Sequence, residues 1–350
     1  MNNKTNSFAG SGFLQRYAVV IVWIALIILF SVLRPGTFAT GQNASTILSA
    51  NAIIRIIVAF AIMVPLIAGD YDMSAAAVMT LSNMVVAATN VVLGLPIGVC
   101  MILGIVVGIA VGAVNGWIIT KFGINPFIVT MGTQTLVAGL CLMIKRESIG
   151  GVDGFLKNLV NFKVAGLTLS FFYALIMCVV LYYIFDHTAM GKRVLIVGNS
   201  VNVAKLSGIN VKKVRLICFI VSGAIAGFAG VLYTGRTGAG HPSAGLNFLM
   251  PAFAAVFLGS TCIKMGRYNP IGTMIAVYFL ETGITGLQLL GIPIYIQNIF
   301  YGGALILAVL FSVLAKNAQD KREFKQEQLM RQAEMEAQKT VKSAKSVLSS

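Results

Sequence analysis

The chain has 350 residues, of which 57% are hydrophobic and only 11% charged, whereas a soluble globular protein carries about 25% charged residues. Repeated, continuous apolar runs are typical of membrane-spanning helices and exclude a membrane β-barrel, whose strands alternate in polarity. The net charge of +15 lies in loops between these runs with few aromatic residues among the bases, so it does not indicate nucleic acid binding.

The apolar pattern predicts an all-α, polytopic membrane protein with about ten transmembrane helices. Two spans are uncertain and could be broken or re-entrant, because 74–93 is rich in Ala, Ser, Thr and Asn and 247–263 is short. The predicted spans are 17–34, 50–68, 74–93, 95–119, 126–144, 168–185, 214–234, 247–263, 270–290 and 293–315.

Charge in the loops predicts the orientation of these spans. An even number of spans places both termini on one side, and most Lys and Arg residues fall in the loops of that side, so both termini are expected in the cytoplasm. The sequence then divides into a cytoplasmic N-terminus (1–16), a transmembrane domain (17–315) with a cytoplasmic loop at 186–215, and a charged cytoplasmic tail (316–350).

The stretch "AGDYDMSAA" (68–76) places Asp70 and Asp72 directly after an apolar run. On sequence alone the two acids fit a catalytic pair, an ion or sugar site, or a solvated turn between helices.

Further along the chain, Gly104, Gly108, Gly112 and Gly116 form successive GxxxG steps on one helix face. Such faces let helices approach closely in lipid, and the pattern indicates helix packing within the chain or a subunit interface.

The basic loop 186–216 contains "NSVNVAKLSGI", which predicts a short helix that begins after Asn199 or Ser200 and ends at Gly208. Without other information, this helix is either a docking element for a partner or a structured loop with no partner.

Charged residues inside spans cost about 2.5–3.5 kcal/mol each and require an explanation. Glu281 either faces a polar pathway or is protonated and bonded to a neighbouring helix. Thr285 and Gln288 share its helix face and complete a polar stripe suited to a sugar or polyol. Arg55 is expected to lie near the outer end of its span and to extend to the interface.

The sequence contains no GxxxxGK[ST] phosphate loop and no HExxH motif, so it predicts neither nucleotide binding nor an enzyme. Its five cysteines and two histidines are scattered and predict no metal site.

Five stretches resemble, in the same order, permease subunits of the ribose-type and branched-chain-amino-acid-type ABC importers. "GNSVNVAKLSGINVKKVR" (198–215) resembles their coupling loop, whose usual form is GGNxEAARLSGI, and "NPFIVTMGT" (125–133) is similar to their PPFIVTLGT. "DMSAAA" (72–77), "AAVFLGST" (254–261) and "GLQLLGI" (286–292) resemble DLSVGS, AAVVLGGT and NGLNLLGV.

This resemblance implies a fold like that of the type II importers, in the bacterial cytoplasmic (inner) membrane, that moves a ribose-like monosaccharide or related polyol inward. The implied partners are a cytoplasmic ATPase that binds ATP and Mg, an extracytoplasmic solute-binding protein, a second permease copy or homologue, and membrane lipid; the chain itself binds no cofactor or metal.

The resemblance also assigns residues. Asp72 and Ser74 fall in the DLS-type turn, where Asp72 is expected to cap the next helix. Asn202 and Lys205 depart from the usual Glu and Arg, and Asp70 from the usual Gly. The implied ATPase-coupling residues are Asn199, Ser200, Asn202, Ala204, Lys205, Leu206 and Gly208. The candidate substrate pathway comprises Asp70, Asp72, Ser74, Asn125, Thr130, Gln134, Glu281, Thr285 and Gln288.

An ion-coupled secondary transporter is the alternative, with Asp70, Asp72 and Glu281 as proton or sodium sites. Its two halves should show a repeat with matching broken helices, and no such repeat is evident in the sequence.

Overall fold

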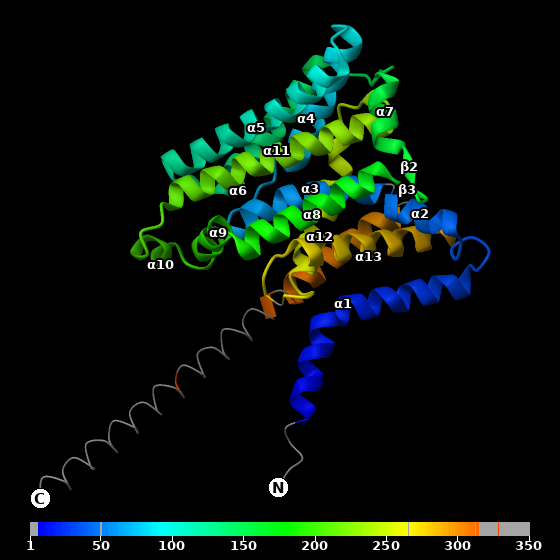
Figure 1. Ribbon diagram of the computed structural model, residues 1–350, viewed down its shortest axis with the longest axis vertical. Coiled ribbons are helices and arrows are strands. Elements are labelled where there is room, and N and C mark those ends of the chain that lie inside the picture. Colours follow the sequence, from blue (N-terminus) through cyan, green and yellow to red (C-terminus); the bar gives the residue numbers. More distant parts are fainter. Residues whose placement is uncertain are drawn as a thin grey trace, which may run out of the picture.

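The computed structural model describes residues 6–49, 51–264, 266–293, 295–311, 313–314 and 328, and within these it is a bundle of helices (Figure 1). The predicted tail 316–350 therefore lies outside the described residues, apart from residue 328. The first half comprises α1 (Asn6–Leu33), α2 (Gly41–Ser49), α3 (Asn51–Ile67), α4 (Ala75–Ala87), the π-helix η1 (Ala88–Val92), α5 (Ile97–Phe122) and α6 (Pro126–Ile144). The second half comprises α7 (Gly154–Asn161), α8 (Leu169–His187), α9 (Ala189–Asn199), α10 (Val201–Leu206), α11 (Val211–Thr237), the 3-10 helix η2 (Ala244–Asn247), α12 (Leu249–Gly259), α13 (Pro270–Leu289) and an apolar helix at Tyr295–Phe311.

The helices confirm an all-α polytopic membrane protein, while the number of about ten crossings stays a prediction. Seven described helical stretches are long and apolar enough to cross a membrane: Gly41–Ile67, Ala75–Val92, Ile97–Phe122, Pro126–Ile144, Leu169–His187, Val211–Thr237 and Pro270–Leu289. Three shorter apolar helices coincide with the remaining predicted spans: Tyr17–Leu33, Ala244–Gly259 and Tyr295–Phe311. The uncertain span 74–93 changes from an α-helix to a π-helix at Ala88, and 247–263 is reduced to the short α12.

Local sequence signals explain several helix boundaries. α6 and α13 each begin with Pro at the first helical position, where the missing N–H costs nothing. The side chains of Asn125 and Asn269, which precede those prolines, accept backbone N–H groups of the first turn. α5 ends at Gly123, whose positive φ is the left-handed conformation that favours glycine.

The centre of the bundle is α3. The successive residues Ile56, Ile57 and Val58, which point to different sides of this helix, are all completely buried, as expected for a helix that is apolar all round. α3 packs against α11, α12, α13 and α8, and Figure 1 shows it between the α5–α11 layer and the α8–α13 layer. α6 is the least buried of the seven described candidate spans and exposes apolar side chains such as Ile128 and Met143, which suits contact with lipid.

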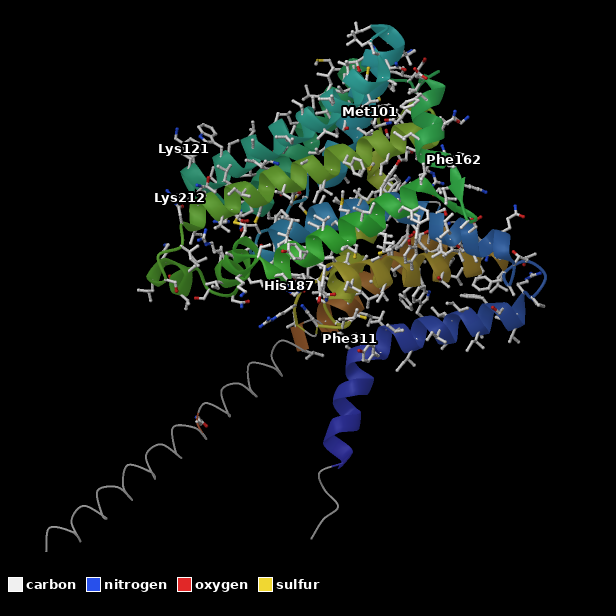
Figure 2. All side chains as sticks on the ribbon, in the orientation of Figure 1. Met101, Lys121, Phe162, His187, Lys212 and Phe311 are labelled. Carbon is white, nitrogen blue, oxygen red and sulfur yellow. The ribbon has the colours of Figure 1, made fainter. Side chains whose placement is uncertain are left out.

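The connecting segments gather at two ends of the bundle. At one end lie α9 and α10, and at the opposite end lie α7 and the hairpin of β2 (Lys163–Val164) with β3 (Leu167–Thr168) (Figure 1). At the α7 end, β1 (Ile149–Gly150) also pairs antiparallel with β4 (Ala239–Gly240). The basic residues Lys121 and Lys212 lie at the α9–α10 end, whereas Phe162 lies at the other (Figure 2).

Candidate coupling and translocation site

The segment α9–α10 forms an exposed two-helix unit at one end of the bundle. Ser200 separates the two helices in extended conformation, and its hydroxyl accepts the N–H of Val203 at 3.4 Å. α10 ends before Gly208, whose φ of 73° favours glycine. The expected short helix therefore has the bounds Val201–Leu206, with Asn199 as the last residue of α9.

α10 is anchored through one residue and exposes the rest. Ala204 is fully buried, whereas Leu206 is 90% exposed, and Asn202 and Lys205 are exposed beside it. Val201 and Val203 of the same short helix are also exposed, and together with Leu206 they make α10 a candidate contact for another protein.

α9 rests directly on the end of α3 through a glycine. A Cβ atom at position 198 would overlap the carbonyl oxygen of Ile67, so only a glycine at this position allows the two helices to approach so closely. α9 therefore contacts the end of α3 directly, just before the turn that joins α3 to α4.

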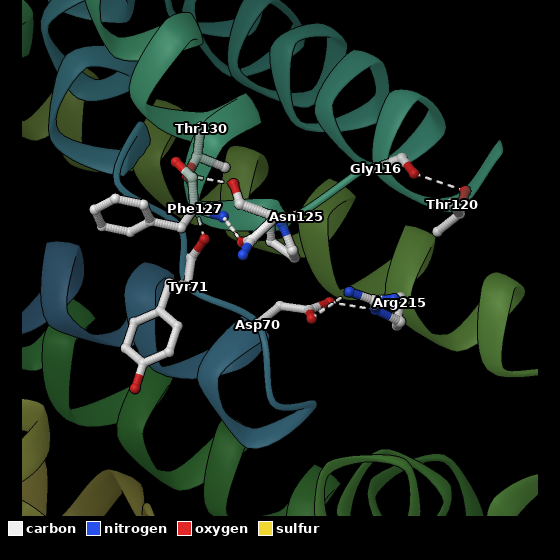
Figure 3. Close-up of polar contacts among 9 residues, drawn as sticks. Asp70, Tyr71, Gly116, Thr120, Asn125, Phe127, Thr130 and Arg215 are labelled. Carbon is white, nitrogen blue, oxygen red and sulfur yellow. Dashed lines mark hydrogen bonds and ion pairs between the residues drawn. The ribbon is translucent and has the colours of Figure 1, made fainter. Parts of the chain in front are cut away.

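Asp70 lies in that turn and forms a bidentate ion pair with Arg215 in the second turn of α11 (Figure 3). The guanidinium Nε donates to Oδ2 at 2.6 Å and Nη2 donates to Oδ1 at 2.5 Å. The side chain of Asp70 is 5% exposed and that of Arg215 is 23% exposed. Two parallel charge-assisted hydrogen bonds fix the relative orientation of the two groups.

Asp72 is the centre of a buried polar network at the start of α4. It accepts the backbone N–H of Ser74 at 2.9 Å, the Ser74 hydroxyl at 2.6 Å and the Ser222 hydroxyl of α11 at 2.7 Å. The Ser74 oxygen also accepts Asn115 of α5 at 3.0 Å, and Asn115 in turn accepts the hydroxyl of Thr133 of α6 at 2.6 Å. Burial raises the pKa of the Asp72 carboxyl, and the hydrogen bonds from Ser74 and Ser222 oppose that rise.

Thr130 ties the same turn to α6. Its buried hydroxyl lies 3.2 Å from the carbonyl oxygen of Tyr71 and accepts the N–H of Met73 at 3.1 Å (Figure 3). Asn125 is occupied by capping α6, because its side-chain oxygen accepts the N–H of Phe127 at 2.9 Å.

A cavity of about 610 Å³ separates the α9–α10 unit from these turns. The ion pair of Asp70 and Arg215 lines one part of its wall, and segments 123–126 and 197–201 line the rest. The structure therefore gathers parts of three sequence-predicted segments, 68–71, 125–126 and 198–201, around one space, whereas Asp72, Ser74 and Thr130 do not line it.

Glu281 and its expected stripe lie elsewhere. Glu281, in α13, forms an ion pair with Arg55 of α3, and Tyr301 lies 3.4 Å from the same carboxylate oxygen. The Arg55 side chain is only 12% exposed and lies against the rings of Phe248 and Tyr301, so the expectation that it extends to the interface was wrong. The carboxylate of Glu281 neutralises the charge of Arg55 inside the bundle, so the guanidinium does not have to reach the membrane interface.

Gln134, Thr285 and Gln288 differ from the other pathway residues. Gln134 and Thr285 are half-buried, and Gln288 is exposed near the end of α13. Among the described residues, none of these three side chains has a hydrogen-bond partner. In this they differ from Asp70, Asp72 and Thr130, whose side chains all have partners within the chain.

The glycines of α5 lie against α11. Cβ atoms at Gly108 and Gly112 would overlap the carbonyl oxygens of Gly223 and Phe219, and a Cβ at Gly116 would lie 2.9 Å from the Leu216 side chain. Gly104 meets Val86 and Ser82 of α4 instead. These glycines thus allow backbone contact between helices within one chain.

Sequence reasoning missed four residues of this site: Thr133, Gly198, Arg215 and Ser222. Arg215 was counted only among the loop charges that set the orientation. Its position in the first turns of a span could have identified it, because a charged residue there requires a partner.

Two comparisons, with protein families and with known proteins, find matches that agree with each other. A family model described as the branched-chain amino acid transport system permease component matches residues 43–309. The chain is 32% identical to the D-allose transport system permease protein of Escherichia coli, over 85% of this chain and 91% of that protein. It is 32% identical to the ribose import permease protein of Haemophilus influenzae (91% and 98%) and 27% identical to the autoinducer 2 import system permease protein of Salmonella paratyphi A (85% and 92%). No solved structure matches.

Proposed function

This chain belongs to the permease family of sugar ABC importers, and from that membership we propose that it carries a ribose-like monosaccharide or related polyol into the cytoplasm, driven by ATP hydrolysis in a separate subunit. The observation that carries the ATP-driven mechanism is the α9–α10 unit: an exposed short helix, anchored by Ala204, whose supporting helix contacts the end of α3 through Gly198.

A cytoplasmic ATPase docks on α10 in this proposal. Leu206 supplies an apolar contact, while Asn202 and Lys205 supply polar ones. ATP-driven movement of this helix would switch the pathway between outward- and inward-facing forms, as a two-state element requires. A solute-binding protein would deliver the sugar at the opposite end, beside a second permease copy or homologue.

The charge distribution supports the location. The chain is a multi-pass membrane protein, and we place it in the bacterial inner membrane with the α9–α10 end and both termini in the cytoplasm, because most loop Lys and Arg residues lie on that side.

The substrate remains a class rather than one sugar. The relatives named above are permease proteins of systems for D-allose, for ribose and for autoinducer 2. The free polar side chains of Gln134, Thr285 and Gln288 would offer hydrogen bonds to sugar hydroxyls without holding the solute tightly.

The contacts of the carboxylates disfavour the alternative of an ion-coupled transporter. Asp70 is paired with Arg215, Glu281 with Arg55, and Asp72 accepts three hydrogen bonds. Each of these carboxylates already has partners within the chain, so none of them requires a bound proton or sodium ion to account for its burial.

Uptake measurements test the proposal. Cells that express the chain with its ATPase and binding protein should accumulate radiolabelled D-ribose or D-allose, and replacement of the phosphate-loop Lys of the ATPase should abolish that uptake. Uptake that survives this replacement but collapses with the ion gradient would overturn the proposal.

A further inference from the structure

The turn between α3 and α4 is contacted from two sides by elements that belong to different parts of the chain. On one side, Gly198 of α9 lies on the carbonyl oxygen of Ile67. On the other side, Arg215 of α11 holds Asp70 and Ser222 of α11 holds Asp72. Ile67 and Asp72 are separated by only a few residues, so a displacement of Ile67 must be taken up within this short stretch.

We propose that Asp70 is a positioning residue: its ion pair with Arg215 fixes the α3–α4 turn to α11, so that a movement of α9–α10 is passed to the polar network at the start of α4. The proposal rests on the proposed function, in which an ATPase moves α10. It assigns to Asp70 a mechanical connection within the protein and removes it from the substrate pathway.

The geometry supports a directional connection rather than general packing. The bidentate pair restricts both the distance and the angle between the turn and α11, which a single apolar contact would not. The cavity beside the pair lies between α9–α10 and segments 123–126, and α9 therefore has space to move relative to those segments.

The receiving element is the network of Asp72. Through Ser74, Asn115 and Thr133 it joins the start of α4 to α5 and α6, and through Ser222 it joins α11. A shift of the turn by about 1 Å would lengthen these contacts beyond hydrogen-bond distance. The network can thus convert a small displacement near α9 into a change in how four helices meet.

Asp70→Asn and Arg215→Gln test the proposal in the complex with the co-purified ATPase, with Lys264→Gln as the matched control. Lys264 forms an ion pair with Asp186 at the same end of the bundle but does not contact the turn. The first readout is hydrogen–deuterium exchange of peptides from α9–α10 and from residues 68–79, with and without a non-hydrolysable ATP analogue. The second is the number of D-ribose or D-allose molecules taken up per ATP hydrolysed.

In the wild type and in Lys264→Gln, nucleotide should change exchange in both regions. In Asp70→Asn and Arg215→Gln, it should change exchange in α9–α10 only, and uptake per ATP should fall by about tenfold or more, because one charge of a largely buried pair is left without its partner. The charge-exchanged variant Asp70→Arg/Arg215→Asp should recover both responses, and if it does not fold, the single variants decide.

A nucleotide response in residues 68–79 that persists in Asp70→Asn, or an uptake per ATP that is unchanged in both single variants, would overturn the inference and leave the proposed function intact. Failure of the wild-type chain to associate with any ATPase or to respond to nucleotide at all would overturn the proposed function, and the inference with it.

Discussion

Arg55 of α3 and Glu281 of α13 form an ion pair inside the helix bundle, beneath the rings of Phe248 and Tyr301. The Nε atom of Arg55 has no hydrogen-bond partner among the described residues, so the guanidinium depends on Glu281 for its neutralisation. The pair connects the central helix α3 to α13, and α13 in turn supports α1, as the hydrogen bond from Trp23 to Thr282 shows. The contact between α3 and α13 therefore accounts for the carboxylate of Glu281 inside the bundle, without any role in solute binding.

Replacing one residue of the Arg55–Glu281 ion pair should destabilise the bundle more than replacing both. We expect Arg55→Leu or Glu281→Leu to lower the free energy of unfolding by about 3–5 kcal/mol, because each leaves a buried charge uncompensated, whereas the double variant should recover most of this loss. Thermal unfolding in detergent, analysed as a double-mutant cycle, measures the difference. Single variants as stable as the wild type would show that water or lipid headgroups reach the site.

Glycine packing between α5 and α11 gives a second prediction. Gly108→Ala should lower the free energy of unfolding by about 1–3 kcal/mol, because the new methyl group overlaps the backbone of Gly223 and the helices must separate. Gly139→Ala is the matched control: nothing lies within 4 Å of its Cβ position on α6, and alanine is the better helix former by about 1 kcal/mol. Equal stability of the two variants would contradict close packing of these helices.

The docking role of α10 is tested by Asn202→Ala combined with Lys205→Ala. We expect insertion into the membrane to be unchanged while ATP hydrolysis is no longer coupled to transport, with a loss of uptake of about tenfold or more, as for truncation of interface residues that carry most of the binding energy. Lys121→Ala, an exposed base at the same end, should leave uptake unchanged. Normal uptake in the double variant would exclude α10 as the coupling element.

A free amide near the pathway should affect substrate affinity. Gln134→Leu should raise the KM for the transported sugar by up to about tenfold, the value of one neutral hydrogen bond, without a change in stability. Thr135→Val, on the next residue, removes a hydroxyl that is bonded to the backbone of its own helix at Met131, so it should not change the KM. Equal effects of the two substitutions, measured as initial rates of uptake, would remove Gln134 from the pathway.

Much of the fold was predictable because the membrane imposes it. Apolar runs such as 97–122 and 270–289 have to form helices, since lipid offers no partner for free backbone groups. Gly208 follows the short helix as predicted, and Pro126 and Gly123 lie at the start of α6 and the end of α5 for the same local reason, as their backbone preferences do not depend on distant residues. The short helix between Ser200 and Gly208 was predicted on these grounds as well.

The sequence by itself therefore determined the membrane-helical class, the place of the helices and the exposed α10 segment. Only the tertiary structure decided which charges pair: Asp70 with Arg215 and Arg55 with Glu281 lie far apart along the chain, and no local pattern relates their helices. The physical reason is that a buried charge needs a specific partner, and the choice among distant partners depends on how the helices pack, which here depends on close backbone contacts such as those of Gly108 with Gly223 and Gly198 with Ile67.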